Sequence, residues 1–344
     1  MRQLTFLGPG SLEWREVPDP AIETPRDAII RPFSVATCDL DGAVIRGGAP
    51  IPGPYPFGHE CVAQVIETAA EVTTVKRGDQ VICPFQISCG ECDRCRRGLT
   101  GSCKGLPARS AYGLGPIGGT QWGSALSDYM RVPFADAMLV KVAPGSGGLA
   151  SCADNVPDGW RTVAPHLEKN PGAPVLILGG AGPGSIPLYA TAIARALGSD
   201  VRYVDYNPKR LEIAASLGAQ AEQVTEGEYP QNFGKYPITV DGTANANGLA
   251  CAIRSVEPWG VCTSTGIYFV PTPMPLFEMY SIGITFITGR VNARAALEPV
   301  LDLVNAGKLQ PEKVTTETAS WDDAIEALKG YTTKLVIARE PLAL

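Results

Sequence analysis

Residues 175–205 read VLIL GGAGPG SIPLYATAIARALGSD VRYVD, which is an apolar run, a glycine cluster, a helix-like run and a second apolar run that ends in an acid. An apolar run directly before glycines predicts a buried parallel strand. Glycines let the backbone turn sharply and approach a ligand closely. The positive end of the following helix would face a pyrophosphate, and Asp205 could accept both hydroxyls of an adenosine ribose.

This order of elements favours a dinucleotide site over the ordinary tight loop that a lone glycine-rich turn would indicate. Ser185 takes the third glycine position of the pattern, where a small side chain still lets a helix pack on a strand. The second half of the chain is therefore expected to be an α/β domain with a doubly wound parallel sheet, and the expected loop contacts to the cofactor are Gly180, Ala181, Gly182, Pro183 and Gly184.

The composition narrows the class of protein. The chain has 344 residues, enough for two domains, and a net charge of −6, which argues against a nucleic-acid partner. No apolar stretch is long enough to span a bilayer and no signal peptide is evident, so we expect a cytoplasmic protein without a membrane partner. Ten cysteines in such a chain predict metal ligands and free thiols, and two histidines exclude a histidine-rich site.

The first 150 residues predict a β-rich domain that binds metal. Short β-like runs separated by turn signals, at 4–7, 27–32, 61–68, 80–83 and 128–132, are typical of an irregular barrel or a twisted antiparallel sheet. Four closely spaced thiols can close on one tetrahedral zinc, and such a closed shell is structural. An iron–sulfur cluster or free cysteines are the alternatives for this lobe, which comprises Cys89, Cys92, Cys95 and Cys103.

Two further stretches supply candidates for a second, open zinc site. Cys38 stands in Cys38-Asp39-Leu40-Asp41, and His59 stands in Gly58-His59-Glu60. One thiolate and one imidazole make two of the three protein ligands that an open catalytic zinc needs.

These motifs, in this order, resemble the zinc-containing medium-chain alcohol dehydrogenases over nearly the whole chain. The resemblance implies a GroES-like barrel domain, a Rossmann domain, two zinc ions, and hydride transfer between an alcohol or carbonyl substrate and NAD or NADP. It also implies a homodimer or homotetramer. The expected domains are a catalytic domain at 1–153, an NAD-binding domain at 154–290 and a return to the catalytic domain at 291–344.

The resemblance places the third ligand of the catalytic zinc just before the cofactor domain, where Cys152 and Asp154 compete. We favour Asp154, because the segment is similar to the acidic variant found in formaldehyde dehydrogenases. Glu60 would lie behind the ligands or bind the zinc transiently. Asp41 could accept a hydrogen bond from the second ring nitrogen of His59.

Asp205, at the end of the second Rossmann strand, predicts a preference for NAD, because its carboxylate would repel the 2′-phosphate of NADP. Arg210 is expected to cover the adenine or the ribose without outweighing that carboxylate. The run 260–266 looks like the family's strand beside the nicotinamide, and its end brings in Gly266 and Ile267.

Position 40 departs from the family, which has a serine or threonine there to start the proton relay. Leu40 cannot do so, and His166 lies far along the chain, so water, Asp39 or Glu60 would have to substitute. Leu40 also makes the expected pocket apolar, with three aromatic candidates, and this favours a bulky or cyclic secondary alcohol. The missing hydroxyl keeps open a non-redox lyase or ligand-binding protein on the same fold. The aromatic candidates are Tyr55, Trp122 and Tyr268.

Overall fold

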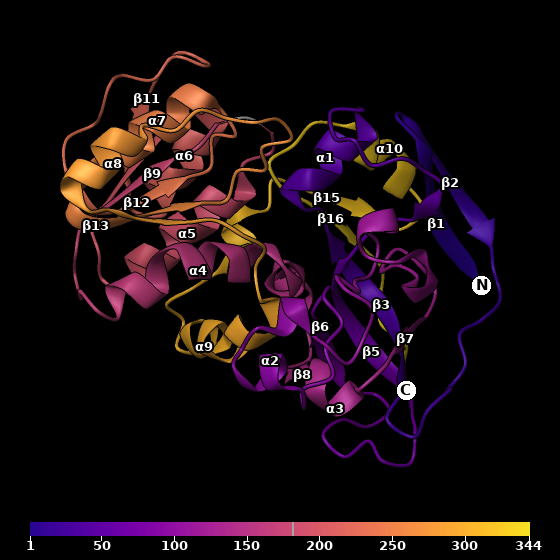
Figure 1. Cartoon of the computed structure of the whole chain (residues 1–344). Helices are drawn as coiled ribbons and strands as arrows, with labels where there is room; N and C mark the ends of the chain where they lie inside the picture. The colour runs from indigo at the N-terminus through magenta and orange to yellow at the C-terminus, as the bar shows by residue number, and fades with distance from the viewer. Residues whose placement is uncertain (181) are drawn as a thin grey trace. The chain divides into compact units, whose positions relative to one another are not determined.

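The computed structural model describes every residue of the chain except Ala181. The chain divides into two compact units (Figure 1). The first unit comprises residues 1–157, 291–299 and 315–344, and the second comprises 158–290 and 300–314. Residues 300–314 therefore do not return to the first unit as the sequence suggested, because the short helix η5 (Pro311–Val314) packs against α5 (Ser185–Ala196) of the second. No helix among the described residues is long and apolar enough to cross a membrane.

The first unit is built on two sheets. A three-stranded sheet has the order β2-β1-β4, and a larger one has the order β15-β16-β3-β5-β6-β8, with β7 paired to β3. The strands are β1 (Arg2–Gly8), β2 (Ser11–Glu16), β3 (Ala28–Ala36), β4 (Tyr55–Pro56), β5 (Glu60–Thr68), β6 (Gln80–Cys83), β7 (Met130–Val132), β8 (Val140–Val142), β15 (Glu317–Ser320) and β16 (Leu335–Ala338).

Short helices connect these strands. They are α1 (Asp39–Ile45), α2 (Asp93–Arg96), η1 (Thr100–Ser102), η2 (Gly115–Ile117), η3 (Thr120–Trp122), α3 (Ala135–Met138), η4 (Ser146–Ala153) and α10 (Ala324–Lys329). The five β-like runs of the sequence all contribute to strands. Strand β2 was not predicted because half of the residues in its sequence SLEWRE are charged and all of them are half-buried or exposed. The apolar faces of both sheets form one core, with Leu4, Phe6, Ile30 and Val35 inaccessible or nearly so.

The second unit is a six-stranded sheet in which every pairing is parallel, with the order β11-β10-β9-β12-β13-β14. Its strands are β9 (Val175–Leu178), β10 (Val201–Asp205), β11 (Gln220–Gln223), β12 (Tyr236–Asp241), β13 (Val256–Ser264) and β14 (Thr285–Ile287). Helix α5 packs against α6 (Pro208–Ser216), and α7 (Ala246–Arg254) packs against α8 (Leu276–Ile282). Helices α4 (Asn155–Leu167) and α9 (Ala293–Asn305) each begin in the first unit and end in the second.

The apolar run Val175–Leu178 forms the central strand β9, and all four of its residues are inaccessible. Strands β10 and β12 flank it on opposite sides, so the strand order reverses at β9. In open parallel sheets, ligands bind beyond the carboxyl ends of the strands at such a reversal. The glycine-rich loop begins there, which confirms the doubly wound arrangement that residues 175–205 predicted.

Candidate metal centres and cofactor loop

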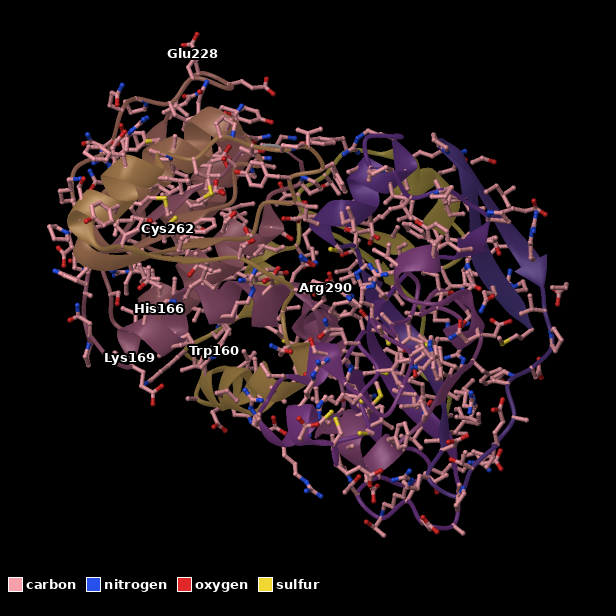
Figure 2. All side chains as sticks on the ribbon, in the orientation of Figure 1. Trp160, His166, Lys169, Glu228, Cys262 and Arg290 are labelled. Atoms are coloured by element: carbon pink, nitrogen blue, oxygen red, sulfur yellow. The ribbon has the colours of Figure 1, made fainter. Side chains whose placement is uncertain are left out.

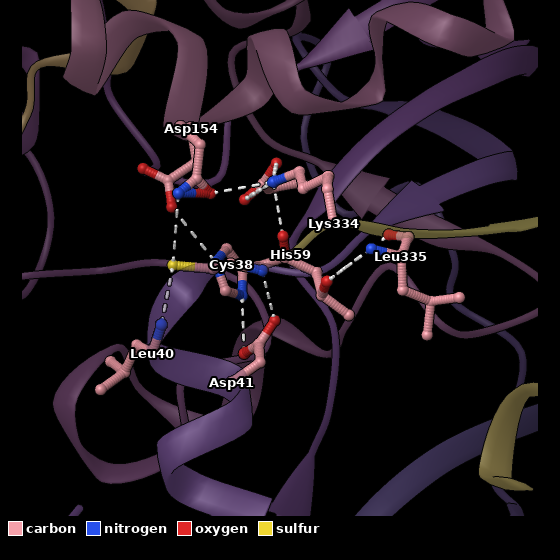
Figure 3. A network of polar contacts seen from close by, with 10 residues as sticks. Cys38, Leu40, Asp41, His59, Asp154, Lys334 and Leu335 are labelled. Atoms are coloured by element: carbon pink, nitrogen blue, oxygen red, sulfur yellow. Dashed lines mark hydrogen bonds and ion pairs between the residues drawn. The ribbon is translucent and has the colours of Figure 1, made fainter. Parts of the chain in front are cut away.

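One side chain cluster in the first unit joins Cys38, His59, Glu60 and Asp154, whose ligand atoms all lie within 4.8 Å of one another (Figure 3). The pairing of β3 with β5 explains the first three, because Ala36 lies opposite Glu60 in the register. Cys38 therefore leaves β3 beside the start of β5. Asp154 arrives from the end of η4. Residues more than 110 positions apart thus meet at one point.

Helix α1 fixes the thiol of Cys38. Cys38 is the N-cap of that helix, and the Asp41 carboxylate accepts a hydrogen bond of 2.8 Å from the Cys38 amide. The Leu40 amide donates to the Cys38 sulfur at 3.5 Å. These contacts fix the sulfur within the cluster, at the positive end of a short helix.

The imidazole of His59 lies between two carboxylates. Its Nε2 is 3.3 Å from Asp154 Oδ2, and its Nδ1 is 3.7 Å from Asp41 Oδ1. The second distance is within ion-pair range but longer than a hydrogen bond, and Nδ1 has no hydrogen-bond partner among the described residues. Asp41 thus faces the ring nitrogen that the sequence assigned to it, at a slightly greater distance.

The distances in this cluster fit a zinc ion. Zinc bound tetrahedrally to nitrogen and oxygen at about 2.0–2.2 Å separates two such ligand atoms by roughly 3.4 Å, close to the His59–Asp154 distance of 3.3 Å. The thiol, imidazole and carboxylate are all ligand types that zinc accepts. Cys152, the competing third ligand, is fully buried in η4 and does not belong to this cluster.

The charges in the cluster also favour the binding of a cation. Burial and the Asp154 carboxylate raise the pKa of the Cys38 thiol well above its usual value. Burial would lower the pKa of His59, but Asp41 and Asp154 raise it to about 9. A buried cluster with excess negative charge raises the pKa values of its acids and of its imidazole. A divalent cation would offset this negative charge.

Glu60 is paired with the buried Lys334, a contact that the sequence did not predict. Lys334 donates to both Glu60 oxygens at 3.1 and 2.8 Å, to the Thr37 carbonyl at 2.5 Å and to Asn155 Oδ1 at 3.1 Å. Burial nevertheless raises the pKa of Glu60 to about 8. A lone lysine directly before the apolar run Leu335–Ala338 was the only sequence signal for this contact.

The four cysteines of the second candidate centre come together between β6 and η2. Cys92 is the N-cap of α2, Cys95 lies within that helix, and Cys89 and Cys103 flank them. The sulfur atoms of Cys89 and Cys103 are 3.5 Å apart, near the roughly 3.8 Å expected for two thiolates on one tetrahedral zinc. All four are free thiols.

Backbone amides surround these sulfur atoms. The Cys92 sulfur accepts hydrogen bonds from the amides of Cys95 and Lys104, each at 3.5 Å, and these lower the pKa of Cys92 to about 6. The Cys103 sulfur accepts from the amides of Cys89 and Gly105. Gly90, with φ of +76°, makes the tight turn after Cys89, and a Cβ there would lie 2.6 Å from the Ala137 methyl group. The backbone amides thus favour a thiolate at Cys92, while burial raises the pKa of Cys95 and Cys103.

In the second unit the glycine loop joins β9 to α5. The N-cap of α5 is Gly184, with φ of +74° and no side-chain cap. Gly182 has φ of +76°, and no atom lies within 4 Å of where its Cβ would be. An open, uncapped loop at a helix N-terminus fits the pyrophosphate of a dinucleotide. Ala181 lies outside the described residues, so its predicted contact is not described.

Asp205 and Arg210 differ from what the sequence suggested. Both side chains are fully buried and form a two-point ion pair, at 2.8 Å from Nε and 2.6 Å from Nη2. Arg210 therefore does not lie exposed over an adenine or ribose site in this structure. The Arg210 guanidinium instead binds carbonyl oxygens of the glycine-rich loop.

Comparison with known proteins agrees with this geometry. The domain family described as "Alcohol dehydrogenase GroES-like domain" matches residues 24–144. A "Probable zinc-binding alcohol dehydrogenase" of Mycobacterium tuberculosis is 27% identical, with 99% of this chain and 87% of that protein covered. The solved structure of an alcohol dehydrogenase from Thermus sp. ATN1 has a TM-score of 0.84 at 27% identity, covering 98% of this chain and 99% of that one. These matches support the zinc-containing medium-chain dehydrogenase/reductase family for this chain.

Another similar relative in this family is the glutathione-independent formaldehyde dehydrogenase of Pseudomonas aeruginosa, at 34% identity over 241 residues. That alignment covers 65% of this chain and 59% of the relative, so the chain spans about three fifths of the length of that protein.

Two of the expected pocket aromatics have packing or hydrogen-bonding partners inside their own units. Tyr55 is buried in the first unit, with its ring centroid 5.2 Å from that of Phe6. The Tyr268 hydroxyl donates to the buried Asp241 carboxylate at 2.9 Å. Trp122 is half-buried against the core of the first unit. The packing of Tyr55 and the hydrogen bond of Tyr268 fit the alternative that these aromatics belong to the core, and a role in a substrate pocket stays a prediction.

The remaining candidates lie in the second unit. His166 lies on α4 (Figure 2). Its Nε2 is 3.4 Å from the Thr263 hydroxyl of β13, and burial lowers the pKa of His166. Gly266 lies just after β13, and a Cβ at this position would lie 2.8 Å from the Tyr268 ring. Ile267 beside it is half exposed. The contacts of Gly266 and Ile267 with a cofactor stay predictions.

Proposed function

We propose that the protein is a zinc-dependent oxidoreductase that transfers hydride between an alcohol and NAD. One observation carries this proposal: a single chain combines an open set of thiol, imidazole and carboxylate ligands with a glycine loop at the strand-order reversal of a parallel sheet. Incubating the zinc-loaded protein with NAD⁺ and a panel of alcohols, and following NADH absorbance, tests it. Binding of zinc and NAD without NADH formation would favour the alternative, a lyase or ligand-binding protein.

Cys38, His59 and Asp154 would hold the catalytic zinc, and the four-cysteine lobe would hold a structural one. A zinc ion in the open site supplies a Lewis acid that lowers the pKa of an alcohol hydroxyl, while NAD⁺ supplies the hydride acceptor. Asp41 orients the His59 ring from the opposite side to Asp154. Lys334 keeps the Glu60 carboxylate from crowding the ligands. The protein thereby contributes placement and charge.

The alcohol proton leaves by a route that does not use a hydroxyl at position 40, since that residue is leucine. Glu60 is the strongest protein candidate in the first unit, because its carboxyl has a pKa near 8 and lies within 4.8 Å of the other ligand atoms. Asp39 and water are the other candidates. If Glu60 takes the proton, Glu60→Gln should have a lower kcat that depends less on pH than that of the wild type. If water takes the proton, the pH dependence of kcat should be unchanged.

Two substrate classes are proposed in competition. Leu40 gives an apolar side chain where the family has a hydroxyl, which favours a bulky or cyclic secondary alcohol. The 34% identity to a protein named as a formaldehyde dehydrogenase favours a small hydrated aldehyde. Comparing kcat/KM for cyclohexanol and formaldehyde decides between them, since a hydrophobic pocket discriminates by roughly 10–200-fold for each methylene it is built to accept or reject.

We also propose a preference for NAD over NADP. Arg210 is paired with Asp205, so its charge is already compensated and its guanidinium is not available to a 2′-phosphate. Calorimetric titration should give a Kd for NAD at least about tenfold below that for NADP, which corresponds to ~1.4 kcal/mol. Equal affinities would mean that another cation, with exposed Lys209 the nearest in sequence, binds the phosphate.

Self-association is proposed from an apolar patch on the second unit. Trp259, Phe277 and Tyr280 are 80–85% exposed, and the Trp259 ring lies beside Gly283 at the end of α8. Three aromatic side chains supply roughly 400–600 Å² of apolar surface, a large part of the ~800 Å² per partner in a standard interface. Strand β14 at the adjacent sheet edge could pair with its own copy about a two-fold axis. Trp259→Asp should shift the mass in light scattering toward the monomer, whereas a monomeric wild type would contradict this proposal.

A further inference from the structure

The Arg210 side chain is fully buried beneath the glycine-rich loop, and all of its donors are used. An arginine guanidinium has five N–H donors. Two of them bind the Asp205 carboxylate, at 2.8 and 2.6 Å. The other three meet carbonyl oxygens of the loop: those of Gly180 at 2.6 Å, Gly182 at 2.8 Å and Pro183 at 3.4 Å.

The Asp205 carboxylate is saturated as well. Its Oδ1 accepts from Arg210 and from the Asn207 amide at 2.9 Å, and its Oδ2 accepts from Arg210 and from the Tyr203 hydroxyl at 2.8 Å. A carboxylate offers about four acceptor sites, so a ribose hydroxyl could bind only by displacing one of these donors. In this structure Asp205 therefore acts as the counter-ion of Arg210.

Two glycines of the loop make room for this ion pair. A Cβ at Gly179 would lie 2.2 Å from Asp205 Oδ2, and a Cβ at Gly184 would lie 2.9 Å from Arg210 Cδ. Only a residue without a side chain lets the ion pair pass under the loop. The glycine pattern thus encodes an internal contact in addition to the approach of a cofactor.

We propose that Arg210 is a positioning residue that, held by Asp205, fixes the glycine-rich loop in the conformation that accepts a dinucleotide pyrophosphate. This inference rests on the proposed NAD binding. A trans peptide points its C=O and N–H in opposite directions. Turning the Pro183 carbonyl toward Arg210 therefore turns the Gly184 amide away from it, to the side where α5 begins. The guanidinium thus gives the loop a rigid support, which the flexible glycines cannot supply.

Arginine suits this position for two reasons. Burial would lower the pKa of Arg210, but the hydrogen bonds and charge of Asp205 raise it, so the cation persists at all physiological pH values. Its planar fork also reaches two carboxylate oxygens and three carbonyls at once, whereas a lysine ammonium has only three donors at one point. A lysine at position 210 could keep the ion pair but would release part of the loop.

The test compares Arg210→Lys and Arg210→Gln with the control Arg202→Gln in the zinc-loaded protein. Arg202 donates from two nitrogens to one Glu222 oxygen in the same sheet, away from the loop, so its loss removes an arginine ion pair of this unit without touching the loop. The readouts are thermal unfolding, amide hydrogen exchange of residues 179–184 without cofactor, the calorimetric Kd for NAD, and kcat and KM for NAD.

We expect both Arg210 variants to exchange the loop amides at least tenfold faster and to bind NAD at least tenfold more weakly. For Arg210→Lys, KM for NAD should rise while kcat stays within about twofold, and Arg202→Gln should bind NAD as the wild type does. Wild-type exchange and affinity in Arg210→Lys, or equal losses in Arg202→Gln, would overturn the proposal. If the wild type bound no NAD, the proposed function would fail, while the exchange data would still test whether Arg210 holds the loop.

Discussion

Replacing Lys334 with methionine should destabilise the first unit more than any other single loss of charge there. Lys334 and Glu60 are both inaccessible to solvent, and the three ammonium donors reach Glu60, Thr37 and Asn155. Methionine fills the space but leaves Glu60 without its counter-ion, so this buried group must remain an unpaired carboxylate or take up a proton. Removing one partner of a buried ion pair costs about 3–5 kcal/mol.

For a unit of this size, each kcal/mol shifts the melting temperature by about 2–4 °C, so Lys334→Met should lower Tm by about 6–20 °C. Differential scanning calorimetry of the zinc-loaded protein measures it. The matched control is Lys329→Met, whose ion pair with Glu326 is exposed and should contribute less than about 1 kcal/mol. In the double variant Glu60→Gln, Lys334→Met, part of the loss should be recovered, because no buried charge is left unpaired. A Tm change below about 3 °C in Lys334→Met, or no recovery in the double variant, would refute this reasoning.

Three further outcomes are expected. Asp154→Ala should lose one of two zinc ions per chain by elemental analysis while Cys152→Ser keeps both, and the reverse result would transfer the ligand role to Cys152. Cys92→Ser should lose the other zinc and lower Tm. An unchanged zinc content and Tm in this variant would contradict a structural role for the four-cysteine lobe. The buried Asp27 has a lowered pKa because hydrogen bonds from Thr24, Arg131 and two amides outweigh its burial. Its stabilising effect is therefore present above its ordinary pKa of about 3.9 and is lost as pH falls through the lower folded value. Acid unfolding of Asp27→Asn should accordingly depend less steeply on pH than that of the wild type, and identical acid transitions would contradict the assignment.

Local chemistry made much of this protein predictable from its sequence. The run Val175–Leu178 and its glycines predicted the central strand and the loop, because an apolar strand beside a glycine turn has few other uses. The four closely spaced cysteines and the Cys38 and His59 motifs gave the metal candidates for the same reason: few other arrangements use these residue types at such spacing. Those predictions depended on short-range pattern alone.

Contacts between distant segments were not predictable in the same way. Lys334 lies 274 residues from Glu60, and only the pairing of β16 with β3 and of β3 with β5 brings them together. Asp205 was placed correctly at a strand end, whereas Arg210, expected in the loop that follows, lies in helix α6. Their mutual pairing was missed because it depends on loop carbonyls whose directions the sequence does not specify. The packing of Tyr55 and the hydrogen bond of Tyr268 were not predicted for a similar reason, since exposure cannot be read from residue type.

The central claim is that the open cluster of Cys38, His59 and Asp154 makes this chain a zinc- and NAD-dependent alcohol oxidoreductase. The most direct measurement is NADH formation from NAD⁺ and secondary alcohols by the purified protein, before and after removal of the more labile zinc with a chelator and after its return. Activity that disappears with that zinc and returns with it, while His59→Ala stays folded and inactive, is the predicted result. Activity that survives removal of the zinc, or no NADH from any alcohol or aldehyde with both zinc ions and NAD bound, would contradict the account.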